Sequence, residues 1–423
     1  MTLSRPNLVK LLSPVAVFCV LLAALIAVNG GHGLELPGPS RDVARSGDPV
    51  RDAQAAVRAA PGSAAAYALL GEAYLTRARE TGDPSLYARA ERAFDAGLRR
   101  DPRELGALIG AATLAGVRHD FRAELRLGLA ARRAAPDLAR PYTVVFDAQI
   151  ELGRYAAAER SVQRLVDLKP SLPAYARASY YRELTGDDGG AIAAMRLAAS
   201  AGGTAEGIAY VQTLLGDLQL AHGRAAAARD AYREALRALR PYPAALAGLA
   251  RVDAAGGDLG SAAARLRRST ELLPLTANLT LLADVERTLG RRRAARADLA
   301  AARAQHAVLT AGGTLPDAEA VLFEAGHGSP ERAVALGRRV WRAAPSVRSA
   351  DALGWALTRA GRPAAGLRWS HRALAIGSRD RRFSLHGAVA ASRVGLGREA
   401  DRLFAVARRG RAALAPSLAR RLP

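Results

Sequence analysis

The chain has 423 residues, with 61 lysines and arginines against 39 aspartates and glutamates, so its formal net charge is +22 and its pI is about 11.2. Half of the residues are apolar but only 5% are aromatic, so any core is built largely from small side chains. The single cysteine, Cys19, excludes a disulfide framework, a cysteine-ligated zinc site and a CxxC redox motif. The glycine and proline content also excludes a collagen-like chain, and the apolar content excludes a fully disordered one.

The amino-terminal segment differs from the rest of the chain. Residues 11–28 are almost entirely apolar and follow Arg5 and Lys10. This is the pattern of an export signal, and the whole stretch approaches the length of a membrane span. No clean cleavage site stands near Val28, which favours an uncleaved anchor within residues 1–33; a cleaved signal peptide and a secreted product are the alternative. We expect the body of the chain on the extracytoplasmic side of the membrane, after a linker over residues 34–53.

A repeat runs through the rest of the chain. Apolar residues recur at helical spacing and are interrupted by Gly or Pro every dozen or so residues. One small residue marks each of ten units, about 34 residues apart: Ala90, Ala123, Ala158, Ala191, Ala228, Ala262, Ala295, Ala333, Gly366 and Ala400. Five residues earlier, eight units have a glycine: Gly153, Gly186, Gly223, Gly257, Gly290, Gly328, Gly361 and Gly395.

These positions predict a helix-turn-helix pair in each unit. A glycine that ends the first helix can adopt the left-handed conformation that reverses the chain. The small residue in the second helix lets the two helices approach closely, and a large residue one turn later fills the space between pairs. Each pair hides its apolar face only against its neighbours, so we expect a stack that a terminal truncation shortens without collapsing.

The units resemble tetratricopeptide repeats. Tyr67, Leu70, Gly71 and Tyr74 match the first-helix signature of that family, and the third unit carries similar residues. The resemblance implies an all-α solenoid, a right-handed superhelix of about ten helix pairs that acts as a binding scaffold. An apolar amino terminus before such an array is similar to exported or membrane-anchored repeat proteins of actinobacteria.

The repeat divides the chain into segments. We expect units one to seven over residues 54–309, a Gly-containing connector over 310–316, units eight to ten over 317–410 and a basic tail over 411–423.

Sequence patterns for catalysis are missing. Neither lysine follows a glycine, which excludes a Walker A loop, and there is no GxSxG or HExxH motif. The seven histidines are spread along the chain, and Asp187 and Asp188 stand where a helix cap is expected. We therefore predict a protein that is not an enzyme, with no cofactor, metal or small-molecule substrate.

The concave face, which this family lines with the first helix of each pair, is the candidate binding site. Spacing from the turn glycines places a mixture of arginine, tyrosine and carboxylate side chains there, which suits a protein or peptide partner. The residues are Arg140, Asp147, Arg177, Tyr180, Glu183, Tyr210 and Asp217. Ordinary solvation of a helix face would give the same pattern.

The arginine excess supports a second hypothesis. Only Lys10 and Lys169 are lysines, and the arginines are scattered among Ala, Gly and Pro, as in proteins from GC-rich genomes. The runs at 291–293 and 408–411 nevertheless keep open a surface that binds a polyanion, such as an envelope polymer, lipid headgroups or nucleic acid. Nucleic acid is the least favoured of these, because it requires a cytoplasmic body.

Overall fold

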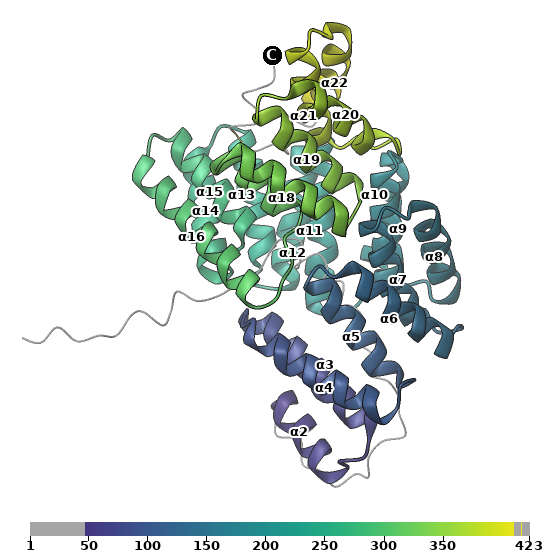
Figure 1. Cartoon of the computed structure of the whole chain (residues 1–423). Coiled ribbons are helices and arrows are strands. Elements are labelled where there is room, and N and C mark those ends of the chain that lie inside the picture. Colours follow the sequence, from purple (N-terminus) through teal and green to yellow (C-terminus); the bar gives the residue numbers. More distant parts are fainter. Residues whose placement is uncertain (1–46, 410–415, 417–423) are drawn as a thin grey trace, which may run out of the picture.

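The fold is an array of paired helices. A computed structural model describes residues 47–409 and residue 416, and these residues form 21 helices and no strand. α2 (Pro49–Ala59) precedes ten helix pairs, which confirms the predicted all-α array of ten units (Figure 1).

The pairs follow one another in chain order. They are α3 (Ala64–Thr81) with α4 (Ser85–Arg100), α5 (Leu105–Val117) with α6 (Phe121–Ala134), α7 (Ala139–Glu151) with α8 (Tyr155–Leu168), α9 (Leu172–Leu184) with α10 (Asp188–Ser200), α11 (Ala205–Ala221) with α12 (Ala225–Ala238), α13 (Pro243–Ala255) with α14 (Leu259–Leu272), α15 (Thr276–Thr288) with α16 (Arg292–Ala311), α17 (Ala318–His327) with α18 (Pro330–Ala343), α19 (Val347–Arg359) with α20 (Pro363–Leu374), and α21 (Arg381–Arg393) with α22 (Gly397–Arg409).

The packing within and between pairs follows the repeat. Tyr232 of α12 is completely buried, and its ring lies against Gly216 of α11 and Gly248 of α13. A Cβ on either glycine would overlap the ring, so the large residue of the second helix enters a space that two glycines leave open. The large residue of the second helix therefore holds its own pair and the next pair together.

The second unit departs from the predicted register by one residue. His119, not a glycine, has positive φ (60°) in the turn between α5 and α6, and Asp120 then caps α6 by accepting a hydrogen bond from the Ala123 amide. The small-residue position therefore falls on Glu124, which is buried, and not on the predicted Ala123. Burial raises the pKa of Glu124 well above its usual value, and the nearby carboxyl groups of Asp147 and Glu151 add to this shift.

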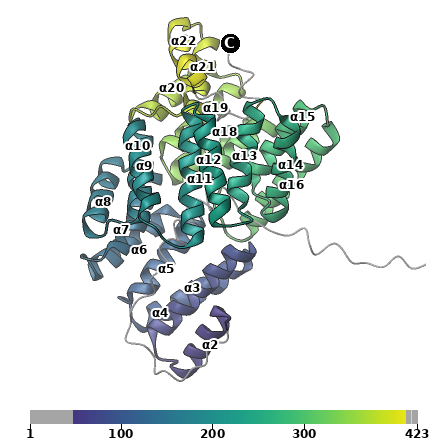
Figure 2. The same cartoon turned by 180° about the vertical axis from the view of Figure 1, so that it is seen from behind.

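The array turns back on itself, so that late units lie against early ones (Figures 1 and 2). The turn after α7 meets the loop between α18 and α19, where the Val347 amide donates a hydrogen bond of 2.7 Å to the Tyr155 hydroxyl. Gly153 in this turn has φ of 66°, and a Cβ on it would collide with the Pro345 carbonyl oxygen. Gly186, one unit later, faces the Gly377 carbonyl oxygen in the same way. Glycine at these turns thus permits the close approach of early and late units as well as the chain reversal.

Hydrophobic clusters cross the contact between the layers. In one, Phe146 and Leu184 of units three and four pack with Val347 and Phe383 of units nine and ten. In another, side chains of α6 and α7 pack with Ala344, directly after α18. The expectation that each pair packs only against its neighbours, so that truncation merely shortens the array, is therefore wrong for these units.

Two segments outside the helix pairs are held by hydrogen bonds. Leu315, in the loop between α16 and α17, donates an amide hydrogen bond of 2.9 Å to the Arg118 carbonyl oxygen, and its own carbonyl oxygen lies 2.8 Å from His119 Nδ1. At the other end, α2 begins inside the segment predicted as a linker, because the Asp48 carboxylate accepts hydrogen bonds from the amides of Val50 and Arg51 and caps the helix.

The contact between layers gives a prediction for stability. Phe383→Ala should destabilise the protein by about 3–5 kcal/mol, the usual cost of truncating a buried aromatic side chain. Amide hydrogen exchange should then rise in α7 and α9 as well as in α21. The control is Phe404→Ala, since Phe404 packs in a cluster confined to α20–α22. Unchanged exchange in α7 and α9 in the Phe383→Ala variant would contradict the coupling of the two layers.

Candidate functional site

The concave face of the array encloses a central hollow of about 370 Å³. Its walls come from α7, α9, α11 and α13 on one side and from α19, α21 and the loop before α21 on the other. We call this space the central hollow. Because the late units face the early ones across it, the concave surface here has walls on two sides.

Six of the seven predicted site residues line this hollow. They are Asp147, Arg177, Tyr180, Glu183, Tyr210 and Asp217. The seventh, Arg140, is not among the lining residues and pairs with Glu72 of α3 over 3.1 Å. Whether these residues contact a partner stays a prediction.

Arg177 and Asp147 form a closed pair within the wall. The Arg177 Nε and Nη2 atoms donate to the two Asp147 carboxylate oxygens over 2.9 and 2.6 Å, and the Arg177 side chain is only 2% exposed. Such a two-point contact fixes both side chains, and the two opposite charges neutralise each other. This pair therefore ties α9 to α7.

A second pair lies one unit further along. The Asp217 carboxylate of α11 accepts hydrogen bonds from the Tyr232 hydroxyl and from Arg251 of α13. Burial disfavours the charge on Arg251, but the Asp217 carboxylate outweighs this effect and raises the pKa of the guanidinium. Asp217 and Arg251 thus join neighbouring first helices across the wall.

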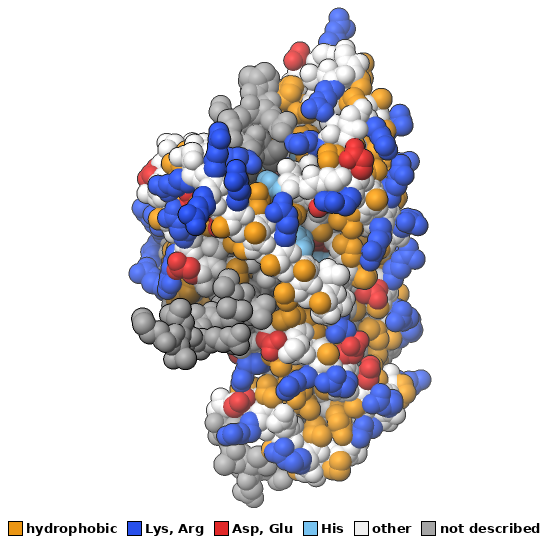
Figure 3. Space-filling model, turned by 60° about the vertical axis from the view of Figure 1, so that its left-hand side comes forward, with side chains coloured by type: hydrophobic (Ala, Val, Ile, Leu, Met, Phe, Trp, Pro, Cys, Tyr) orange, Lys and Arg blue, Asp and Glu red, His pale blue; other side chains and the backbone are white. Residues whose placement is uncertain are grey.

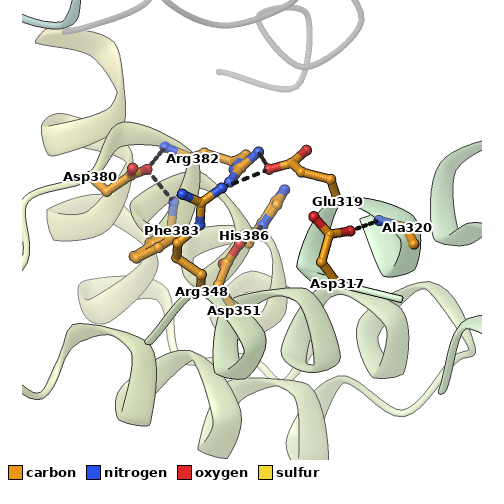
Figure 4. A network of polar contacts seen from close by, with 9 residues as sticks. All are labelled: Asp317, Glu319, Ala320, Arg348, Asp351, Asp380, Arg382, Phe383 and His386. Atoms are coloured by element: carbon orange, nitrogen blue, oxygen red, sulfur yellow. Dashed lines mark hydrogen bonds and ion pairs between the residues drawn. The ribbon is translucent and has the colours of Figure 1, made fainter. Parts of the chain in front are cut away.

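Two arginines of the opposite wall, Arg348 and Arg382, contact Glu319 of α17, which does not itself line the hollow (Figure 4). Its Oε1 atom lies 3.0 Å from Arg382 Nη1 and 3.5 Å from Arg348 Nη2. Burial opposes ionisation of Glu319, but the two arginines outweigh it and lower its pKa, so this carboxylate stays charged at neutral pH. Asp380 caps α21 by accepting hydrogen bonds from the amides of Arg382 (2.7 Å) and Phe383 (3.1 Å).

Glu151 and Glu183 line the same wall, and the Arg348 guanidinium acts to lower the pKa of both. Glu151, at the end of α7, is 8% exposed, and burial raises its pKa to about 7. Glu183, near the end of α9, is an exposed residue of the same wall. Its partial desolvation there, with Asp380 and Asp217 nearby, raises its pKa.

The repeat register could have found the three lining arginines that the sequence prediction missed. Arg251 stands six residues before its turn glycine, as do Asp147, Tyr180 and Asp217. Arg348 and Arg382 stand thirteen residues before theirs, as does Tyr210. What the register does not supply is that units nine and ten face units three to five across one space.

Other sites that the sequence raised have structural explanations. Asp187 accepts a hydrogen bond of 2.9 Å from the Gly190 amide, which confirms that it caps α10. His386 and Asp351 form a buried pair, with Nδ1 3.0 Å from each carboxylate oxygen, beneath the ring of Trp355. Within residues 47–409, no cluster of three or more His, Cys, Asp or Glu is arranged to hold a metal ion.

The predicted export segment and basic tail lie outside the described residues, except for residue 416 of the tail. In the part of the chain that the structure describes, every helix is too short or too polar to cross a bilayer.

Comparison with known proteins gives structural similarity only. No family model matches the chain, and a search of curated proteins found no match. Similar solved structures include a thermophilic TPR protein of Thermus thermophilus, TTC0263 (20% identity, covering 40% of this chain and 90% of that one, TM-score 0.36). They also include a tetratricopeptide repeat protein from Parabacteroides merdae (14%, 53% and 85%, 0.43) and the human IFIT1 dimer with PPP-AAAA (15%, 78% and 78%, 0.48).

The buried ion pair in the wall can be tested by stability measurements. Arg177→Met should leave the Asp147 carboxylate buried without a countercharge, at a cost of about 3–5 kcal/mol. The double variant Arg177→Met/Asp147→Leu should recover most of this loss, because two apolar side chains need no countercharge. Urea unfolding of the single and double variants measures both steps. A double variant as unstable as Arg177→Met would show that the pair does not account for the loss.

Glu151 gives a prediction for the pH dependence of stability. Its pKa of about 7 in the folded protein exceeds the value of 4.5 in an unfolded chain, so the folded state keeps a proton that the unfolded state releases. The free energy of unfolding should therefore fall as the pH rises from about 4.5 to 7, by up to about 3 kcal/mol.

The variant Glu151→Gln should lack this loss. Its urea midpoint should exceed that of the wild type at about pH 8 and approach it at about pH 4. Glu234→Gln is the control, because Glu234 is an exposed partner of Arg237 on α12. Identical pH profiles for wild type and Glu151→Gln would contradict the raised pKa.

Proposed function

We propose that this chain is a non-catalytic scaffold that binds a partner protein by taking a short segment of it into the central hollow. The observation that carries the proposal is the convergence of charged and aromatic side chains from six first helices on one space. Clefts of this kind, mostly apolar with a few directed polar groups, are typical binding sites.

The size of the hollow favours a short segment. Its volume of about 370 Å³ lies at the low end of the range of roughly 300–1,000 Å³ that is usual for ligand pockets. Units nine and ten occupy the far side, so a long helix does not fit along the concave face. A few residues of an extended chain, or a loop tip, suit this space better.

Polyanion binding is the second candidate, and it concerns a different surface. Arg292 and Arg293 of α16 and Arg408 and Arg409 of α22 are exposed. Figure 3 shows Lys and Arg side chains spread over the face drawn there. A polyanion would therefore bind the exterior, and its affinity should fall steeply with salt, whereas contacts inside the hollow are screened less.

The location that we propose is the outer side of the cell membrane. Its support is the apolar segment within residues 1–33, preceded by Arg5 and Lys10. In this arrangement the segment anchors the scaffold, or is removed to release it, and the array meets exported partners.

The proposal predicts that filling the hollow abolishes peptide binding. Random peptides displayed on phage and selected on the whole chain should yield sequences that Glu183→Trp no longer binds, because the indole takes up the space. Arg233→Trp on the outer face of α12 is the matched control, since Arg233 is 60% exposed. Circular dichroism should show equal helicity in both variants.

Selected peptides that bind Glu183→Trp as well as wild type would move the binding surface away from the hollow. Loss of peptide binding only in Arg233→Trp would favour polyanion binding by the exterior. The selection of none but polyanionic peptides would favour it as well.

A further inference from the structure

A second pocket, with a volume of about 390 Å³, lies between α16 and α17. Its walls are completed by α15, α18, the loop before α17 and His119 in the turn after α5. We call it the side pocket. It shares no lining residue with the central hollow, and its volume is within the range of roughly 300–1,000 Å³ that is usual for ligand pockets.

Apolar side chains form much of the lining of the side pocket. Leu309 of α16 and Phe323 of α17 are buried in its wall. The centroid of the Phe323 ring lies 5.4 Å from that of the His306 ring. Leu315, in the loop before α17, is 38% exposed, although hydrogen bonds fix its backbone on both sides. The side pocket therefore offers an apolar surface to the body of a ligand.

Three neutral side chains of the lining each have a buried atom without a hydrogen-bond partner among the described residues. These atoms are Thr276 Oγ1 of α15, His306 Nε2 of α16 and Thr314 Oγ1 of the loop before α17. Both threonines are more than nine-tenths buried. Burial lowers the pKa of His306, so its imidazole is neutral at pH 7. Buried polar groups without partners are costly and rare, and here three segments of the chain bring them to one pocket.

Four of the five charged side chains in the lining already have partners. The Glu319 carboxylate is bound by Arg348 and Arg382 (Figure 4). Asp317 caps α17, because its carboxylate accepts a hydrogen bond of 2.9 Å from the Ala320 amide. Neither carboxylate is left for a ligand without the loss of these contacts.

The remaining charged side chains of the lining give the same result. The Glu324 carboxylate accepts a hydrogen bond of 2.7 Å from Arg332, and Arg303 donates one of 2.8 Å to the His327 carbonyl oxygen. The fifth charged side chain, Arg339, belongs to an exposed residue of α18. The buried groups that still lack a partner are thus all neutral, which favours a neutral ligand.

We propose that the side pocket binds a small neutral hydroxylated molecule with an apolar body, whose hydroxyl groups form hydrogen bonds with Thr276, His306 and Thr314. A hydroxyl group both donates and accepts, as do the threonine hydroxyls, and a neutral imidazole nitrogen does one or the other. A site of this kind rejects a ligand without hydroxyl groups, because its own polar groups then stay unpaired. The inference assigns a ligand and no reaction, and it goes beyond the proposed function, which concerns the central hollow.

The test uses the whole chain and pairs of fragments in which a methyl group replaces each hydroxyl group. The pairs are resorcinol with m-xylene, benzyl alcohol with ethylbenzene, and cyclohexanol with methylcyclohexane. Titrations followed by nuclear magnetic resonance should show a hydroxylated fragment binding about tenfold more tightly than its hydrocarbon counterpart. The hydrophobic effect alone gives the opposite order, since a methyl group gains more from burial than a hydroxyl group does.

Variants assign the binding to the side pocket. Thr276→Val/Thr314→Val keeps the shape of both side chains and should weaken the hydroxylated fragment about tenfold, while the hydrocarbon binds as before. Thr270→Val on α14, outside the lining, is the matched control and should change neither. Ala277→Trp should abolish binding of both fragments, because Ala277 lines the pocket and the indole takes up its space.

A stability measurement keeps the inference testable without a ligand. Thr276→Val/Thr314→Val should not lower the urea midpoint of the free protein, because methyl groups replace hydroxyl groups that have no partner. A lower midpoint than that of Thr270→Val would show that the two hydroxyl groups contribute hydrogen bonds to the folded protein. That result would overturn the inference.

The remaining outcomes also decide. The inference fails if no hydroxylated fragment binds, if the hydrocarbons bind equally well, or if binding survives in Ala277→Trp. Acetyl-tyrosine-amide binding more tightly than every fragment would assign the pocket to a side chain of a partner protein and overturn the small molecule. None of these results affects the scaffold, which is tested by Glu183→Trp in the central hollow.

Discussion

The contact of units three and four with units nine and ten is the constraint on which the rest of the structure depends. At the turns of units three and four, Gly153 and Gly186 bring backbone against backbone, and a single added Cβ would hold the layers apart. Phe383 and Val347 then bury their side chains against Phe146 in α7. A repeat array normally draws its stability from neighbours in sequence, whereas here units separated by some 200 residues share one core.

The same contact creates the chemistry of the central hollow. Arg348 and Arg382 of the late units and Glu151 and Glu183 of the early units meet across it, and Arg348 acts on both glutamates. Burial outweighs Arg348 at Glu151, so its raised pKa means that the folded protein loses stability as the pH rises toward neutrality.

The repeat itself was readable because it depends on local stereochemistry. The predicted turn glycine at Gly153 and the predicted small residue at Ala158 behave as expected, one with positive φ and the other fully buried. The prediction slipped by one residue in the second unit, where His119 adopts the left-handed turn and Glu124 takes the small position. A non-glycine residue with positive φ gives no compositional signal, so the error could not be seen in the sequence.

The sequence by itself determined the helix pairs, their number and six of the side chains on the concave face, because a period of about 34 residues sets which side of each first helix faces inward. Only the tertiary structure decided that Arg348 and Arg382 lie on the wall opposite Glu183, that Arg177 is buried against Asp147, and that the late units face the concave surface of the early ones. The reason is physical. The curvature of a stack is the sum of small rotations at every interface, so no single repeat determines where a late unit contacts an early one.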